Sequence, residues 1–380
     1  MTSTAIIMIV TIAVYLLIMV VIGAVYSKKN KSTDDFYLGG RKLGPLVTAM
    51  SAEASDMSSW LLMGLPGVAL VYGLAEASWT AIGLGIGTWV NWFIVAKRIR
   101  TYTQKLDAVT IPEFFSKRFG DKKNILSLIA GLVILVFFVP YTASGFNACG
   151  TLFSSLFGVD YFTAMVISAV VIVAYTTLGG FLAASTTDLI QSIVMTIALV
   201  VVVGFGINYA GGWDNVVVNA NSMPGFLEFF NTYDPTTNAS TPYNALTVAS
   251  TLAWGLGYFG MPHILLRFMA ISDKNKLKTS RRIATVWVFI SMAIAILIGV
   301  IGSAAVKNGT IALDNANSQR IIIEIAKLIS GNGAVFAILA GVILAGILAA
   351  TMSTSDSQLL AAASAVSQNI VKEFFHKNLS

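Results

Sequence analysis

The stretch Ser51-Ala-Glu-Ala-Ser-Asp-Met-Ser-Ser-Trp60, continued by Leu61-Leu-Met-Gly-Leu-Pro-Gly67, decides how this chain folds. It lies within residues 43–96, a segment that contains no Lys or Arg, yet it carries Glu53, Asp56 and four serines. A carboxylate at membrane depth costs about 2.5–3.5 kcal/mol on insertion scales, and such residues usually face a partner or a watered cavity. The stretch therefore predicts a membrane-buried functional site.

The residues that follow Asp56 predict an interrupted helix. Gly64 and Pro66-Gly67 are helix breakers inside an otherwise apolar span. Interrupted helices in transporters expose carbonyl groups and helix ends that hold a cation or a zwitterion. The alternative interpretation is a structural kink in which Asp56 is only hydrogen-bonded.

Composition places the chain in the class of polytopic helical membrane proteins. It has 380 residues, 56% of them hydrophobic and 11% charged, and a mean hydropathy of +0.78. Its net charge of +6 is distributed over alternate loops, which excludes the basic face of a nucleic-acid-binding protein. Cys149 is the only cysteine, so an intramolecular disulfide is excluded. The N-terminus lacks signal-peptide features and is expected to be the first span.

Hydropathy predicts about nine spans, at residues 6–26, 45–70, 79–96, 126–152, 162–178, 189–209, 245–266, 283–306 and 334–360. All but three of the 24 Lys and Arg residues then fall in segments on one side; the exceptions are Lys307, Arg320 and Lys327. The positive-inside rule makes that side cytoplasmic and places the N-terminus outside.

The connections have their own expected structures. Residues 179–188 should form a tight turn, residues 211–244 a long outer loop, and residues 267–282 a cytoplasmic loop. Short amphipathic helices are expected near residues 111–118 and 318–329, and a polar helix should continue from the last span to Lys377.

Two small, polar stretches lie in distant apolar spans, at residues 54–59 and 350–354. A monovalent cation such as Na⁺ binds about five or six oxygens, which hydroxyl groups and freed backbone carbonyls can supply where a helix unwinds. Ser and Thr in membrane helices also serve as contacts between helices, which is the alternative role for either stretch alone.

Four aromatic residues form the second candidate set: Trp60, Tyr141, Trp254 and Tyr258. Rings next to flexible backbone can line a substrate cavity and stack on an apolar ring. The alternative is packing or an interfacial aromatic belt. The sequence contains no catalytic triad, zinc-ligand or phosphate-loop pattern above chance, so we expect no enzymatic activity.

Four motifs in register resemble the solute:sodium symporter family, in its bacterial sodium/proline branch. They are residues 52–67, the segment Tyr175-Thr-Thr-Leu-Gly-Gly-Phe181 with Thr187-Asp188, the segment Trp254-Gly-Leu-Gly-Tyr-Phe-Gly-Met-Pro-His263 with Arg267-Phe-Met, and Ile347-Leu-Ala-Ala-Thr-Met-Ser-Thr354.

The resemblance implies an all-α, LeuT-type fold of two inverted five-helix repeats preceded by an accessory helix. Residues 1–42 would hold the accessory helix and a cytoplasmic loop, 43–210 the first repeat, 211–244 the outer loop and 245–380 a partial second repeat. The chain supplies the accessory helix and eight of the ten core helices, so we expect a C-terminally truncated member of the family.

The resemblance also assigns residue roles. Backbone oxygens of Ala54 and Met57 would bind sodium together with Ala350, Ser353 and Thr354, and Asp56 would act nearby as an electrostatic determinant. The proline pocket would be lined or shaped by Ser58, Trp60, Tyr141, Trp254, Tyr258 and Pro262. Arg41 and Asp188 would take part in coupling and the ion pathway.

Three residues depart from the family pattern: Glu53 and Ser59 in the second span, and the acidic Asp356 near the sodium residues.

The implied function is sodium-coupled symport of L-proline into the cell by alternating access, in a bacterial plasma membrane. Na⁺ would be the coupling ion. The protein would lie in membrane lipid, and we expect no organic cofactor and no nucleic-acid partner. Other functions remain open: symport of another small solute such as a sugar or pantothenate, sensing, or binding by a fragment that does not transport.

Overall fold

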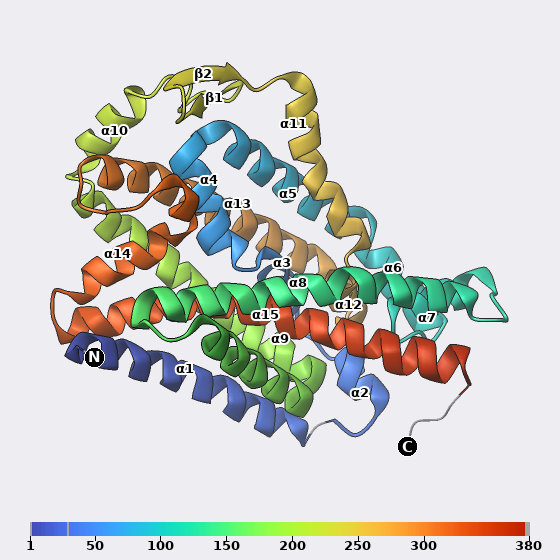
Figure 1. Cartoon of the computed structure of the whole chain (residues 1–380). Helices are drawn as coiled ribbons and strands as arrows, with labels where there is room; N and C mark the ends of the chain where they lie inside the picture. The colour runs from blue at the N-terminus through green and yellow to red at the C-terminus, as the bar shows by residue number, and fades with distance from the viewer. Residues whose placement is uncertain (1, 29, 377–380) are drawn as a thin grey trace.

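The long apolar runs of the sequence form long helices, as Figure 1 shows for a computed structural model that describes residues 2–28 and 30–376. Five helical runs within the described residues are long and apolar enough to cross a membrane. They contain α1 (Ser3–Ser27), α8 (Ile125–Phe157), α9 (Tyr161–Tyr209), α13 (Leu277–Lys307) and α15 (Ala334–Ser364).

Two bent pairs bring the number of membrane-crossing candidates among the described residues to seven. In the first pair, α3 (Pro45–Met57) meets the π-helical segment η2 (Trp60–Gly64) and α4 (Leu65–Tyr72) at 60°. In the second, α5 (Leu74–Ile94) meets α6 (Ala96–Lys105) at 40°.

The run α9 consists of two helical arms that correspond to the fifth and sixth predicted spans. The arms are separated at Gly180, which has φ 59° and ψ −160°. A side chain there would be strained and would also place its Cβ 2.9 Å from the Phe36 carbonyl oxygen. The predicted turn over residues 179–188 is therefore too long, because the residues from Phe181 onward, Asp188 included, are helical.

The remaining described elements are short. They are α2 (Thr33–Leu38), η1 (Gly39–Arg41), α7 (Ile111–Phe119), α10 (Trp213–Asn221), α11 (Ala245–Leu252), η3 (Ala253–Gly260), α12 (Pro262–Ala270), η4 (Lys274–Lys276), η5 (Asn315–Arg320), α14 (Ile321–Ser330) and η6 (Ala365–Phe374). The predicted amphipathic helices correspond to α7 and α14. The predicted polar extension of the last span is η6, and its expected end at Lys377 lies outside the described residues.

The predicted outer loop contains α10 and a small hairpin of β1 (Asn231–Asp234) and β2 (Ala239–Pro242). The strands pair antiparallel, with Asn231 opposite Pro242. The Asp234 carboxylate stabilises the turn by accepting from the Thr236 amide and the Thr237 hydroxyl, each at 2.8 Å. The predicted helical membrane fold is confirmed, and this hairpin is an addition to it.

Segments predicted to share a side of the membrane meet in space. At one end of the bundle the Arg100 guanidinium donates to the Ile271 carbonyl (2.7 Å), and Ile271 pairs with Leu43. At the other end the Lys307 ammonium donates to the Ser222 hydroxyl (2.7 Å). In Figure 1 the start of α1 and α14 lie at one end of the molecule, and α2 and α7 lie at the other.

Candidate functional site

The first predicted helix break is present, but it lies at Ser58, before the predicted breakers. Ser58 has φ 50° and ψ −173°, which ends α3, and its hydroxyl accepts from the Trp60 amide (3.2 Å). Gly64 has a different role, since a Cβ there would lie 2.4 Å from the Trp60 ring. The helix therefore breaks where a serine tolerates a rare conformation, and Gly64 makes room for an indole.

The end of α3 contacts the middle of α15 through oxygen atoms. The Ser353 hydroxyl donates to the Ala54 carbonyl (2.7 Å) and lies 3.2 Å from the Ala350 carbonyl. The Thr354 hydroxyl also donates to the Ala350 carbonyl (3.2 Å). All four residues are buried. We call these residues, with Met57, the oxygen junction.

The donor set of the oxygen junction fits a hard monovalent cation. Because α3 ends at Met57, the carbonyls of its last turn lack the amide partners of a continuing helix. Two such carbonyls, the Ala350 carbonyl and two hydroxyls supply five neutral oxygens of the kind that coordinates Na⁺. The structure brings the predicted residues Ala54, Ala350, Ser353 and Thr354 together, and Met57 ends the same helix.

A second interruption faces the first. The span predicted at residues 245–266 consists of α11, the 3₁₀ segment η3 and α12, with extended backbone at Met261. The η3 segment packs tightly on α5, since a Cβ on Gly87 would lie 2.4 Å from the Gly255 carbonyl oxygen. The Asn91 side-chain amide donates to the Tyr258 carbonyl (2.9 Å) and so satisfies one backbone group of η3.

A cavity of about 150 Å³ lies between the two interruptions. Its lining residues come from α3, η2, α5, α8 and η3 and their junctions: Asp56, Met57, Ser58, Trp60, Leu84, Tyr141, Trp254, Gly257, Tyr258 and Met261. The indoles of Trp60 and Trp254 lie 5.6 Å apart, with 37° between their planes. Trp254 is 55% exposed, whereas Tyr258 is buried.

The predicted substrate residues thus converge on one cavity, with one exception. Ser58, Trp60, Tyr141, Trp254 and Tyr258 line it, whereas Pro262 starts α12 just beyond the lining residue Met261. Asp56, predicted as an electrostatic determinant for sodium, also lines this cavity. Asp56 is thus next in sequence to Met57, the last residue of α3, and lines the cavity as well.

Asp188 is buried in an ion pair with Arg267, with 3.0 Å between the Asp188 Oδ2 and Arg267 Nη2 atoms. The Ser51 hydroxyl donates to Asp188 (2.6 Å) and accepts from Arg267 Nε (2.9 Å). Arg267 also donates to the Ser357 hydroxyl of α15. This pair joins α3, α9, α12 and α15 inside the protein.

Arg267 corrects the predicted cytoplasmic loop, which was expected to begin at this residue. It lies instead within α12 and is only 1% exposed. One sequence signal could have found it: Arg267 follows an apolar run and has no charged neighbour before Asp273. Its partner is 79 positions away, so periodicity could not identify the pair.

Two acids that depart from the family pattern are buried. Glu53 accepts from the Trp92 indole (3.0 Å) on the α5 side of α3. Asp356 accepts from the Tyr175 hydroxyl (2.8 Å) and the Ser357 hydroxyl (3.0 Å). Each carboxylate therefore has hydrogen-bond partners, as burial of a charged group requires.

Arg41 lies apart from Asp188, at the predicted cytoplasmic end. Its guanidinium donates to the carbonyls of Ala108 (2.8 Å) and Met269 (3.0 Å). Burial lowers the pKa of Arg41 from its ordinary value, and nearby carboxylates, Asp34 first among them, act in the opposite direction. Arg41 and Asp188 do not pair with each other, but both are tied to α12, Arg41 through Met269 and Asp188 through Arg267.

Comparison with known proteins gives a consistent result. The profile of the sodium:solute symporter family matches residues 36–380. The sodium/proline symporters of Salmonella typhimurium and Escherichia coli are each 41% identical, over 98% of this chain and 72% of their own lengths. The high-affinity proline transporter PutP of Bacillus subtilis is 42% identical, over 95% of this chain and 73% of its length.

A solved structure has the same fold. It is a Na⁺-coupled sialic acid symporter in a substrate-bound, outward-open state, with a TM-score of 0.81 and 19% identity. The alignment takes in 98% of this chain and 76% of that one. The predicted LeuT-type fold is thereby confirmed, and the chain belongs to the sodium:solute symporter family.

Proposed function

We propose that this protein is a multi-pass symporter of the bacterial plasma membrane that couples the entry of L-proline to the entry of Na⁺. The observation that carries this proposal is the last turn of α3. It contributes Ala54 to the oxygen junction, and Asp56 and Ser58 to the cavity lined with aromatic rings. One short segment of backbone therefore serves both ligands.

For sodium, we propose coordination by the carbonyls of Ala54, Met57 and Ala350 and the hydroxyls of Ser353 and Thr354. These groups come from two helices that meet only in the folded protein, so a bound cation holds α3 against α15. The Asp56 carboxylate, one residue before Met57, adds a favourable potential for the cation.

For proline, we propose the cavity between the two interruptions. The rings of Trp60, Tyr141 and Trp254 offer flat apolar faces to the pyrrolidine ring. The Asp56 carboxylate and the Tyr258 hydroxyl supply polar partners for the secondary ammonium. Pro262 fixes the start of α12 and so sets the position of Met261.

Coupling follows because both ligands favour the same arrangement of the α3 end. Sodium binding orders Ala54 and Met57, which places Asp56 and Ser58 for the substrate, and linkage makes the effect reciprocal. In the proposed cycle Arg41 and Asp188 act through α12, whose position decides whether the inner side is closed. The membrane potential contributes about 2.3 kcal/mol per charge per 100 mV to inward movement.

The test is binding of radiolabelled L-proline to the purified chain in Na⁺ and in K⁺, beside the variants Asp56→Asn and Asp214→Asn. We expect the native chain to bind proline in Na⁺ and not in K⁺, and Asp56→Asn to lose this sodium-dependent binding. Asp214→Asn should bind like the native chain, because the Asp214 carboxylate is exposed on α10. Binding that is equal in Na⁺ and K⁺ would contradict the proposal.

Uptake into proteoliposomes under an inward sodium gradient then tests transport itself. We expect proline to accumulate against its gradient and to be competed more strongly by unlabelled proline than by other amino acids or sugars. If another solute competes more strongly than proline, the proposed sodium coupling stands and the proposed substrate is wrong.

A further inference from the structure

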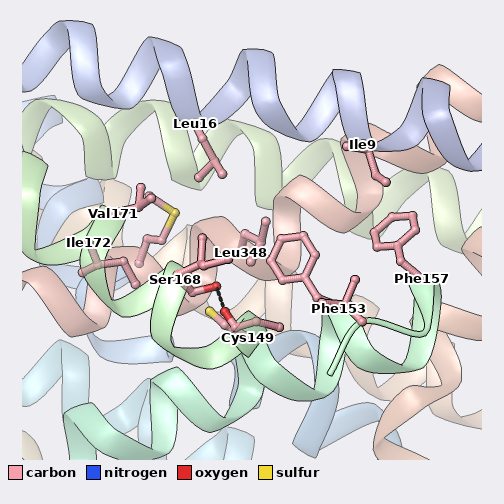
Figure 2. A pocket seen from close by; sticks show the side chains of 13 residues that line it. Ile9, Leu16, Cys149, Phe153, Phe157, Ser168, Val171, Ile172 and Leu348 are labelled. Atoms are coloured by element: carbon pink, nitrogen blue, oxygen red, sulfur yellow. Dashed lines mark hydrogen bonds between the residues drawn. The ribbon is translucent and has the colours of Figure 1, made fainter. Parts of the chain in front are cut away.

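A second cavity, larger than the one proposed for proline, lies between α1, α8, α9 and α15 (Figure 2). It encloses about 240 Å³ and shares no lining residue with the proline cavity. Ile9 and Leu16 of α1 face Phe153 and Phe157 of α8 across it, and Leu348 of α15 lies at its base.

The wall of this cavity offers almost no polar group to a ligand. Ser168 is the one lining side chain with a hydroxyl, and that hydroxyl donates to the Ala164 carbonyl of its own helix (2.9 Å). The lining also contains two sulfur atoms, of Met352 and of Cys149, whose thiol is buried and in no disulfide. An apolar cavity of about 150 Å³ stays dry and takes a benzene-sized molecule. This larger cavity therefore suits an alkyl group of several carbons.

The surface around the cavity is the part of the molecule that hydrocarbon would cover. On α1, Val10 and Leu17 are 55% and 62% exposed, and on α9 Ile167 and Val170 are 58% and 61% exposed. Exposed apolar residues of this size on membrane-crossing helices face lipid chains. The cavity is continuous with that face, because Ile167 belongs to both its lining and the exposed surface.

We propose that this cavity takes the terminal part of one phospholipid acyl chain. The base of the cavity includes Met352, the residue before Ser353 in the oxygen junction. The Met352 sulfur accepts from the Tyr15 hydroxyl (3.9 Å), so the same turn of α15 is also held by α1. The acyl chain supports this turn from the lipid side. The site lies outside the transport pathway proposed above and does not depend on that function.

The test uses the full chain in lipid nanodiscs and two photoactivatable phosphatidylglycerols. One carries its diazirine near the end of an acyl chain and the other carries it in the head group. We expect the acyl-chain probe to label peptides containing Leu348 or Met352, and the head-group probe to leave them unlabelled. Equal labelling of these peptides by both probes, or labelling by neither, would overturn the proposal.

Filling the cavity should remove the label. The variant Ala164→Phe places a ring inside the cavity, and we expect labelling of the α15 peptides to fall to background. The matched control is Val170→Phe on the exposed face of the same helix, which should label like the native chain. Leu16→Trp fills the cavity from α1 and serves if Ala164→Phe does not fold. If a folded variant with a filled cavity still labels on the α15 peptides as strongly as the native chain, the acyl chain does not bind in this cavity and the proposal is overturned.

A measurement of stability checks the occupant. Phosphatidylglycerol added to delipidated protein should raise the melting temperature of the native chain and of Val170→Phe more than that of the filled variants. An equal rise in all of them would count against the site. Labelling by a photoactivatable free fatty acid with none by phospholipid would overturn the assignment of a phospholipid chain.

Discussion

The two interrupted helices meet the same cavity but are built differently. The first break is a single residue, Ser58, followed by a π-helical turn, and it is almost completely buried. The second is the 3₁₀ segment η3, which contains Gly255, Gly257 and Gly260 and exposes Leu256 at 68%. The buried break presents backbone oxygens, whereas the glycine-rich break, which is packed on α5 at Gly255, presents the partly exposed ring of Trp254.

This difference supports the different tasks proposed for the two breaks. A cation needs several oxygens, and the buried end of α3 together with α15 is our proposed source of them. A substrate must enter and leave, and we propose that it does so beside the partly exposed Trp254. Changes at the first break should therefore affect sodium first, and changes at the second should affect proline first.

The largest effect is expected for Ser353→Ala at the first break. It removes a hydroxyl that is proposed to bind sodium and that joins α15 to the Ala54 carbonyl. Loss of an outer-shell partner lowers metal affinity about 10- to 100-fold in other sites, and loss of a ligand should cost at least as much. The measurement is the sodium concentration that half-saturates proline binding. Ser364→Ala is the matched control, because that hydroxyl bonds only to the Ala361 carbonyl of its own helix. Equal effects of Ser353→Ala and Ser364→Ala would contradict the proposal that the oxygen junction binds sodium.

The next effect is expected for Gly87→Ala, which displaces the second break. Its new Cβ would meet the Gly255 carbonyl at 2.4 Å, so η3 must shift, and overpacking of this kind costs about 1–3 kcal/mol. Proline affinity should fall, while the rise in melting temperature on adding Na⁺ is retained. Gly204→Ala is the control, since no atom lies within 4 Å of its added Cβ. A lost response to Na⁺ would show that the breaks do not act separately.

A smaller effect is expected for Trp254→Ala. Trp254 lines the cavity and is proposed to contact the pyrrolidine ring. If that contact is worth as much as a pair of aromatic rings, about 0.5–1.5 kcal/mol, its loss should weaken proline affinity by roughly 2- to 12-fold. Equilibrium binding at saturating Na⁺ measures this change. Trp213→Ala removes an indole that is similarly exposed, on α10, and should leave binding unchanged. Unaltered affinity in Trp254→Ala would take this ring out of the substrate site.

The smallest effect concerns the β1–β2 hairpin, which contacts the end of α4 and precedes α11 in the chain. Its Thr232 hydroxyl donates to the Tyr72 carbonyl at the end of α4 (2.9 Å). The hydrogen bonds from Thr237 and Thr236 lower the pKa of Asp234 from its ordinary value. A lowered pKa contributes stability that is complete above the ordinary value and is lost as pH falls through the lowered one.

Asp234→Asn should therefore melt slightly below the native chain at pH 7. The gap should begin to narrow as the pH falls below about 3.9, the ordinary pKa of aspartate. Differential scanning calorimetry at pH 7 and pH 3 measures the gap. A gap as wide at pH 3 as at pH 7 would assign the effect to packing and not to the charge.

The sequence predicted which residues lie together better than it predicted where the helices break. The aromatic residues and the small, polar stretches lie together as predicted. They could be selected from the sequence because rings, hydroxyl groups and carboxylates are the groups that bind ligands inside an apolar span. The break moved from Gly64 to Ser58 because the left-handed conformation of one serine depends on its tertiary surroundings, which propensities do not contain. Hydropathy predicted the spans and loops. It did not predict the interruption at η3, because residues 253–260 are as apolar as the rest of the predicted span.

The buried ion pair illustrates the limit of local patterns. Asp188 looked like a turn residue because it ends the segment 179–188, which begins with two glycines and has no other charge, and Arg267 looked like the first base of a loop. Each is charged and buried only because the other is present, and that relation is visible in the fold alone. The hairpin was missed for a related reason, since its strands have four residues each and pair only with each other.

The Asp188–Arg267 pair also bears on the speed at which this protein can work. Ser51 and Arg267 belong to the two interrupted spans, whereas Asp188 and Ser357 belong to the long helices α9 and α15. Separating these two groups of helices on the inner side would uncouple a buried charge pair before water reaches it. Removing one partner of such a pair costs about 3–5 kcal/mol in other proteins. In the cycle proposed above, we therefore expect the Asp188–Arg267 pair to act as a kinetic latch that raises the activation barrier for inward opening.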